Sequence, residues 1–194
     1  MSYCTCRQRR IVDEDGEDFE IHHFTLEDDA VIDLPWLRGI RFKHPPPQPI
    51  MLSLEDKDLE EGAFVDYLTT PIPLVSRRLK DAFERAGVSN VEYFDVVVEG
   101  AERLDDFPGY VAINIVGKVD VAEKSKSQST QTFGVPGANQ FDTFVPRADL
   151  ESELQVFRMA EHVSTIVVSD RIKVLSAELG VETLEFVPLA AWGG

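Results

Sequence analysis

Long apolar runs are absent from this sequence. Of its 194 residues 43% are hydrophobic, but no apolar run approaches the roughly 20 residues that a helix needs to cross a bilayer. The first ten residues, MSYCTCRQRR, also lack the apolar segment of a secretory signal. These absences predict that the protein has no membrane partner and that it stays in the cytoplasm.

Cysteine is nearly absent, since Cys4 and Cys6 are the only two. A disulfide across one intervening residue would be strained, and two thiols cannot complete a tetrahedral zinc site. His22 and His23 are adjacent, so on a strand they would point to opposite faces. We therefore expect reduced thiols on a loose N-terminus, and we predict no metal site.

Motifs for nucleotide binding and for catalysis are also missing. The chain contains neither GxxxxGK[ST] nor GxGxxG, so no cofactor is predicted. Lysine follows Ser76 and Ser169 by four residues, whereas the Ser-x-x-Lys enzymes need three. His162, Ser164 and Asp170 lie close in sequence, but no Gly-x-Ser-x-Gly turn accompanies them. We predict no catalytic residue.

Basic residues are scarce relative to acidic ones. Nineteen Lys and Arg stand against 35 Asp and Glu, which gives a net charge of −16. Such a charge repels phosphate backbones, so no nucleic-acid partner is predicted. A basic protein would instead be attracted, and its association would be faster at low salt. Acidity that serves only solubility is the alternative interpretation.

The acids gather towards the N-terminus. Residues 11–33 carry ten acids and no Lys or Arg, yet they include enough apolar residues for a short strand or two. HPPPQP, residues 44–49, predicts a stiff extended connector, because proline fixes φ and removes a donor. We therefore expect an acidic N-terminal lobe over 1–49 and a core over 50–194, together forming one compact unit.

One stretch of the sequence recurs 93 positions later. The serine that opens each copy can cap a helix, an apolar stripe follows at helical spacing, and a glycine ends the helix before a strand. Each copy therefore predicts a capped helix delivered onto a sheet, which is a scaffolding role. The coincident residues are Val75 and Val168, Ser76 and Ser169, Arg78 and Arg171, Lys80 and Lys173, Gly87 and Gly180, Val88 and Val181, and Glu92 and Glu185.

The segments between the copies complete an α+β fold, predicted as a mixed, mainly antiparallel sheet that carries the two helix–strand units. Residues 91–100 and 110–122 predict an antiparallel hairpin. Residues 123–140 are polar and predict a mobile surface loop. Leu150, Leu154 and Phe157 are spaced for a helix, with a strand near Phe157 as the alternative.

The surrounding sequence suggests structural or binding roles for three further residues. Arg158 is a lone base, for which we favour an internal carboxylate partner over an external one. Trp192 is expected to fold back onto the core. Trp36 is either a core residue or an exposed anchor for a partner.

Several segments occur in the order DYLTTPIPLVSRRLKDAFERAGVSNVEYFDV, YVAINIVGKVDVAEKS, VFR, VVSDRIKVLSAELGVETLEF. This order resembles the bacterial polymorphic-toxin immunity family first defined in myxobacteria and long known as a domain of unknown function. The similarity covers roughly residues 64–188. The aligned features, to none of which catalysis is assigned, are Ser76, Tyr93, Asn114, Ser125, Phe157, Arg158 and Ser169.

The resemblance implies a non-enzymatic inhibitor that neutralises a cognate toxin by stoichiometric binding. A cytosolic immunity protein meets a toxin acting in the cytosol, often a nuclease that is basic around its active site. An enzyme with an unrecognised site and a structural or regulatory partner in a larger assembly are the alternatives. The acids expected to bind the toxin are Asp13, Glu14, Asp15, Glu17, Asp18, Glu27, Asp28, Asp29, Asp56, Asp58, Glu60 and Glu61.

Overall fold

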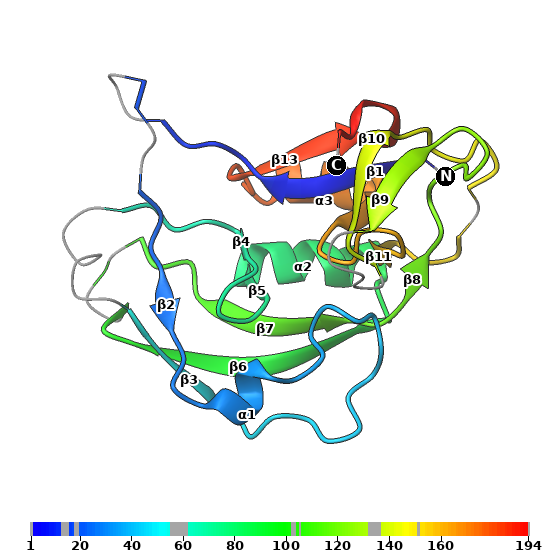
Figure 1. Ribbon diagram of the computed structural model, residues 1–194. Coiled ribbons are helices and arrows are strands. Elements are labelled where there is room, and N and C mark those ends of the chain that lie inside the picture. Colours follow the sequence, from blue (N-terminus) through cyan, green and yellow to red (C-terminus); the bar gives the residue numbers. More distant parts are fainter. Residues whose placement is uncertain are drawn as a thin grey trace.

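The computed structural model of the protein is built around two main β-sheets (Figure 1). The structure describes residues 2–12, 16–17, 20–54, 62–101, 104, 106–131, 137–150 and 152–193. The strands of the larger sheet, in spatial order, are β2 (Phe24–Thr25), β3 (Ile50–Leu54), β6 (Val91–Glu99), β7 (Tyr110–Ile115), β5 (Leu74–Ser76) and β4 (Tyr67–Leu68). Those of the smaller sheet are β13 (Leu184–Pro188), β1 (Tyr3–Gln8), β12 (Ile166–Ser169), β11 (Val156–Met159) and β8 (Lys118–Val119).

Most strand pairs in these sheets are antiparallel. The exceptions are β3 with β6 and β8 with β11, which run parallel. The predicted hairpin of β6 and β7 is confirmed. The structure therefore confirms an α+β fold with mixed, mainly antiparallel sheets, and it divides the strands over two sheets where one was expected.

The recurring sequence forms one unit in each sheet. The first copy runs from β5 through α2 (Arg77–Ala86) to β6, and β7 lies between β5 and β6. The second runs from β12 through α3 (Asp170–Glu178) to β13, and β1 lies between them. In both units the middle strand is antiparallel to its neighbours. Each copy is thus a β-α-β unit split by an inserted antiparallel strand.

The middle strand of the second unit comes from the N-terminal end of the chain. Strand β1 pairs with β12 from Tyr3 to Cys6 and with β13 from Cys4 to Gln8. Cys4 and Cys6 are free thiols, and both are buried in this strand. The expectation of a loose N-terminus was therefore wrong, because the strand is paired on both edges. The division of the chain into 1–49 and 50–194 stays a prediction.

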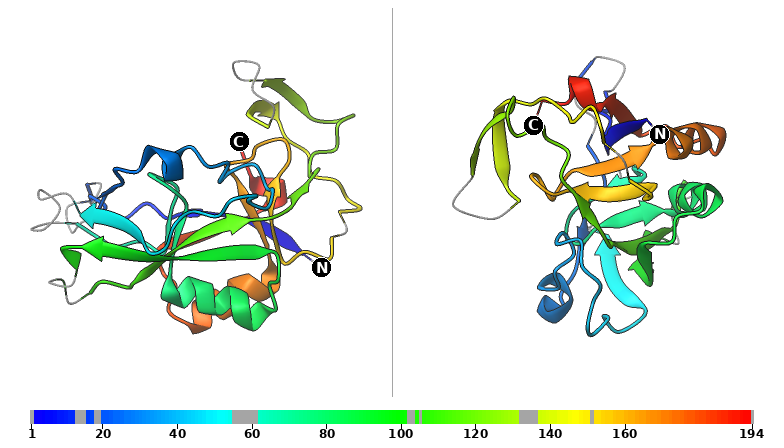
Figure 2. Two further views of the ribbon diagram at one scale, coloured as in Figure 1. Left: turned by 90° about the horizontal axis from the view of Figure 1, so that it is seen from below. Right: turned by 90° about the vertical axis from the view of Figure 1, so that its right-hand side faces the viewer.

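Helices α2 and α3 lie side by side on one side of the molecule (Figure 2). Their buried faces join apolar residues of both sheets in one core cluster, which includes Leu79 and Phe83 of α2 and Ile172 of α3. A second cluster lies on the opposite face of the larger sheet. Trp36 is buried there, and its Nε1 donates a hydrogen bond to the Val31 carbonyl at 2.8 Å, so the core interpretation of this residue holds.

The two repeated serines differ in what they bind. Ser76 caps α2 as predicted, because its Oγ accepts the Leu79 N–H at 3.2 Å. Ser169 makes no such capping bond to α3. Its hydroxyl instead donates to the Gln155 side chain at 2.6 Å. The predicted cap at Ser169 was therefore wrong, since a residue on another segment takes the hydroxyl.

Within the described residues 123–131 and 137–140, strands occur where the composition predicted a mobile loop. Strands β9 (Gln128–Gln131) and β10 (Asn139–Thr143) pair antiparallel in a separate two-stranded sheet that extends away from the body (Figure 2). The mobile-loop prediction was wrong for these strands, because backbone pairing forms them without a buried apolar face. Trp192 folds back as expected and contacts the ring of Phe144 at 4.7 Å between centroids. It follows the 3-10 turn η4 (Leu189–Ala191).

Arg158 is fully buried in β11, where the strand alternative proved right over the helix. Its Nη1 donates to the Val163 carbonyl at 2.9 Å, while Nε and Nη2 have no partner among the described residues. Burial lowers the pKa of this guanidinium. Glu161, the nearest acid in sequence, accepts the backbone N–H groups of Val121 and Ala122 instead. The predicted carboxylate partner was therefore wrong within the described part of the chain.

Candidate protein-binding surface

Four of the acids predicted to bind a partner lie in described parts of the chain, and all four are exposed: Glu17, Glu27, Asp28 and Asp29. Three of them follow one another after β2, and the last of these, Asp29, is the first residue of the short helix α1 (Asp29–Ile32). The remaining predicted acids lie outside the described residues: Asp13, Glu14, Asp15, Asp18, Asp56, Asp58, Glu60 and Glu61.

The acidic run 27–29 is held in place by its neighbours. Phe24 and Val31, one on each side of it in sequence, are buried in the second core cluster. Asp28 caps α1, because its Oδ1 accepts the Ala30 N–H at 3.0 Å. A carboxylate at a helix N-terminus is also favoured by the helix dipole. The run is therefore a fixed acidic surface next to the larger sheet.

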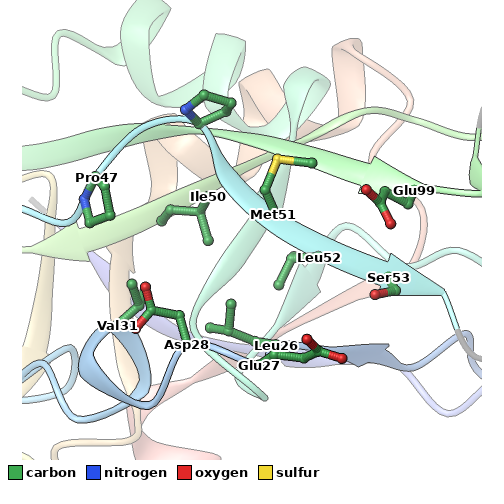
Figure 3. Close-up of a pocket in the computed structure, with 11 residues that line it drawn as sticks. Leu26, Glu27, Asp28, Val31, Pro47, Ile50, Met51, Leu52, Ser53 and Glu99 are labelled. Atoms are coloured by element: carbon green, nitrogen blue, oxygen red, sulfur yellow. The ribbon is translucent and has the colours of Figure 1, made fainter.

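A cavity of about 420 Å³ separates this run from strand β3 (Figure 3). We call it the β3-edge cavity. On one side stand residues of β3, and on the other stands the segment that follows β2. Its lining residues are Leu26, Glu27, Asp28, Val31, Pro47, Pro49, Ile50, Met51, Leu52, Ser53 and Glu99.

Three carboxylates line the β3-edge cavity: Glu27, Asp28 and Glu99. None of them forms a salt bridge with any described Lys, Arg or His. Glu99 ends β6 and pairs with Ser53 of β3, and it is exposed. The cavity therefore presents uncompensated negative charge, which suits a cationic group of a ligand or partner.

Sequence reasoning predicted Glu27 and Asp28 and missed Glu99. Acidity alone could not single out Glu99 among the 35 acids. It reaches the site because β3 and β6 pair in parallel, although Ser53 and Glu99 are far apart in the chain. Parallel pairing of distant strands leaves no local signal in a sequence.

Two apolar side chains are exposed on the same pair of strands. Met51 of β3 and Val97 of β6 face each other in the parallel register, and they are 47% and 44% exposed. Methionine is enriched where proteins meet partners, and its flexible side chain adapts to different surfaces. Acidic and apolar groups thus adjoin each other on this edge of the sheet, which is a combination suited to protein binding.

The serines weighed for catalysis have structural partners. Ser76 donates its hydroxyl to the Asp66 carboxylate at 2.5 Å, and Ser169 donates to Gln155. Neither hydroxyl contacts a histidine among the described residues. Both serines support the β-α-β units, as the scaffolding interpretation predicted.

His162 lies at the turn between β11 and β12. Its Nδ1 is 2.8 Å from the Thr165 hydroxyl and 3.0 Å from the Ser164 hydroxyl. Burial lowers the pKa of this ring. One ring nitrogen thus serves two hydroxyls of its own turn, and no hydrogen bond joins the ring to Asp170 in the structure that is described. This arrangement orders a turn and differs from a catalytic triad.

The described residues offer neither a metal-binding cluster nor a membrane-spanning helix. They contain no group of three or more His, Cys, Asp or Glu side chains placed to hold a metal ion. No described helix combines the length and apolar character that crossing a membrane requires.

Comparison with known proteins places the chain in a family. No curated protein matches the sequence. A family model described as "Immunity protein family (Imm11)" matches residues 6–191, which is nearly the whole chain and includes the acidic run, β3 and both β-α-β units. This chain belongs to the Imm11 immunity protein family.

Proposed function

We propose that this protein neutralises a cognate bacterial toxin by binding it directly in a stoichiometric complex in the cytoplasm. The observation that carries the proposal is the family match over residues 6–191. Proteins of an immunity family protect the cell from a toxin. Binding is the simplest mechanism for a chain whose candidate nucleophiles are engaged in structural hydrogen bonds.

The charge of the chain supports a basic partner. A net charge of −16 attracts a basic toxin and accelerates its association at low ionic strength. Nucleases are such toxins, because the surface that receives nucleic acid is positively charged. The acidic protein would then occupy the surface that the toxin uses for its own substrate.

We assign the contact to the acidic residues predicted from the sequence. Within the described chain these are Glu17, Glu27, Asp28 and Asp29, all of which are exposed. Glu27 and Asp28 also line the β3-edge cavity, so a partner could be recognised there by shape as well as by charge. Because exposed charges mainly govern the association rate, this surface should set how fast the toxin is captured.

The test uses a purified candidate toxin domain taken from a gene adjacent to this one. The two purified proteins are mixed at micromolar concentration, and the mass and stoichiometry of the product are measured by light scattering after size exclusion. Cells that express the toxin domain are then grown with and without this protein. We expect a complex of defined stoichiometry and restored growth. No complex together with no rescue would contradict the proposal.

An enzymatic mechanism predicts a different result in the same experiment. If the protein modified or degraded the toxin, a small fraction of one equivalent would abolish the toxicity. Stoichiometric binding requires at least one equivalent. Titration of toxin activity against added protein therefore separates the two mechanisms.

A further inference from the structure

Strand β3 has an edge that no described strand covers along three of its five residues. It pairs with β6 from Ile50 to Ser53, but with β2 only at Ser53 and Leu54. Within the described ranges, no other strand pairs with residues 50–52, and no backbone hydrogen bond outside the sheet involves them. Since successive residues of a strand direct their backbone groups to opposite edges, part of this N–H and C=O row faces away from β6 without a partner.

The open edge faces the β3-edge cavity. After β2 the chain leaves the sheet, and Leu26, Glu27 and Asp28 stand across the cavity from Ile50 and Leu52 (Figure 3). A cavity of about 420 Å³ falls in the size range of sites that take a small ligand or a few side chains. There is therefore room beside the edge for an extended piece of another chain.

Residues 50–52 of this edge carry no lysine and no charged side chain that would oppose such pairing. Natural proteins guard exposed sheet edges with lysine, proline or inward-pointing charge. The edge residues here are Ile50 and Leu52, whose side chains are buried in the second core cluster, and Met51, which is exposed. Pro47 and Pro49 precede the strand and stop pairing from continuing towards the N-terminus. The accessible stretch of sheet edge is thus short and centres on Met51.

The walls of the cavity indicate the charge of the occupant. Glu27 and Glu99 have no cationic partner among the described residues, and Asp28 uses one oxygen to cap α1. A Lys or Arg side chain would satisfy these carboxylates, and Arg could do so with two parallel hydrogen bonds. On the same pair of strands as Glu99, the exposed Met51–Val97 pair offers an apolar contact.

We propose that the toxin adds an extended segment to the free edge of β3 and places a Lys or Arg side chain of that segment in the β3-edge cavity. This inference rests on the proposed function, because it names the manner in which the same acidic surface holds the toxin. Strand addition supplies backbone hydrogen bonds for affinity, and the acidic cavity supplies specificity for a basic side chain.

Hydrogen exchange of the full-length protein gives the direct test. Amide exchange is followed by mass spectrometry, alone and with a saturating amount of the toxin domain encoded beside this gene. We expect peptides that cover residues 50–54 to gain protection in the complex, and peptides that cover 170–178 to change little. A complex that forms without added protection at 50–54 overturns the inference and leaves the proposed function intact.

A pair of double variants tests the role of the cavity charges. We expect Glu27→Gln with Glu99→Gln to weaken toxin binding about tenfold or more, measured by calorimetry. The matched control, Glu153→Gln with Glu178→Gln, removes the same charge from exposed positions elsewhere and should change the affinity less than about twofold. Equal effects of the two pairs would show that only net charge matters, and would overturn the inference.

Two other results would also decide against this inference. Protection of residues 50–54 in the protein alone that disappears on dilution would assign the edge to a second copy of this chain. Failure to form any complex would remove the proposed function and this inference together. Each result is distinguishable from the others in the same set of measurements.

Discussion

Asp66 and Arg78 form a bidentate ion pair in which the Asp66 carboxylate is fully buried. Arg78 Nε lies 2.5 Å from Asp66 Oδ1, and Nη2 lies 3.0 Å from Oδ2. The same carboxylate accepts the hydroxyl groups of Ser76 and Thr183. Ser76 and Arg78 belong to the first β-α-β unit, whereas Thr183 precedes β13 in the second. Asp66 therefore links the two repeated units through one charged group.

Asp66→Asn is expected to lower the free energy of unfolding by about 2–3 kcal/mol, since hydrogen bonds to a buried charge are lost and Arg78 is left without its partner. The effect should stay below the most severe cases, because the Arg78 side chain is 40% exposed and water can solvate it. Urea unfolding followed by circular dichroism measures the change. Asp95→Asn, at an exposed position, is the control. Similar losses in the two variants would contradict this role of Asp66.

The twin serines allow a matched comparison. Ser76→Ala removes the α2 cap and a hydrogen bond to Asp66, so it should cost about 2 kcal/mol. Ser169→Ala removes one neutral hydrogen bond to Gln155 and no cap, so it should cost about 1 kcal/mol. Both side chains are fully buried, which makes the cost of the lost volume similar. Thermal unfolding of the two variants would refute this ranking if Ser169→Ala proved the more damaging.

These serines also show how far the sequence predicts the fold. The recurring pattern correctly predicted both helices, because helical spacing and capping residues are local signals. It could not predict that Gln155 takes the Ser169 hydroxyl, because that partner comes from a segment outside the repeat. The sequence likewise contained no indication that β1 inserts between β12 and β13, because this pairing joins segments from opposite ends of the chain.

The hairpin of β9 and β10 and the candidate site were missed for related reasons. Strands β9 and β10 are polar except for Phe141, so they lack the alternation by which a strand is recognised. At the site, the run 27–29 was predicted from its density of acids. Glu99, Met51 and Val97 join it only through parallel pairing of β3 with β6, which no local pattern records.

The two cysteines should be chemically silent in the folded protein. Burial raises the pKa of Cys4 to about 11 and raises that of Cys6 as well. Only about one Cys4 thiol in a thousand is then ionised at pH 8, and the thiolate is the reactive form. We expect alkylation by iodoacetamide at pH 8 to be negligible in buffer and complete in guanidinium, as measured by mass spectrometry. Rapid labelling of either thiol in the native state would contradict the burial of β1.

The same shift has a consequence for stability at high pH. Because burial raises the pKa of Cys4 in the folded state, the protonated thiol stabilises the folded protein. This stabilisation is fully present below the unfolded-state pKa of about 8.5. It is lost as the pH rises towards about 11. A Cys4→Ala variant should therefore lose less stability than the wild type between pH 8.5 and 11 in urea unfolding. Parallel pH profiles for the two proteins would disagree with a buried, protonated thiol.

The acidic run is predicted to act on the rate of toxin capture. Glu27→Lys with Asp29→Lys changes the local charge by four units and leaves Asp28, which caps α1, in place. We expect association with the toxin domain to slow by about tenfold at low salt, because opposite charges accelerate diffusional encounter. The dependence of that rate on salt should flatten, while circular dichroism stays unchanged. Stopped-flow fluorescence between 0.05 and 0.5 M NaCl provides the measurement.

The control for this last experiment separates a local contact from total charge. Glu153→Lys with Glu178→Lys makes the same change at exposed positions away from the run. If net charge alone governed the rate, both variants would be slowed equally, because each changes the charge by the same four units. This long-range effect would fade at high salt, as screening shortens its reach to about 10 Å at 0.1 M. A contact at residues 27–29 slows the first variant more strongly and persists at higher salt. Unchanged rates in the first variant would instead direct attention to the described residues of 122–144, whose strands β9 and β10 form a separate sheet that extends away from the two main sheets (Figure 2).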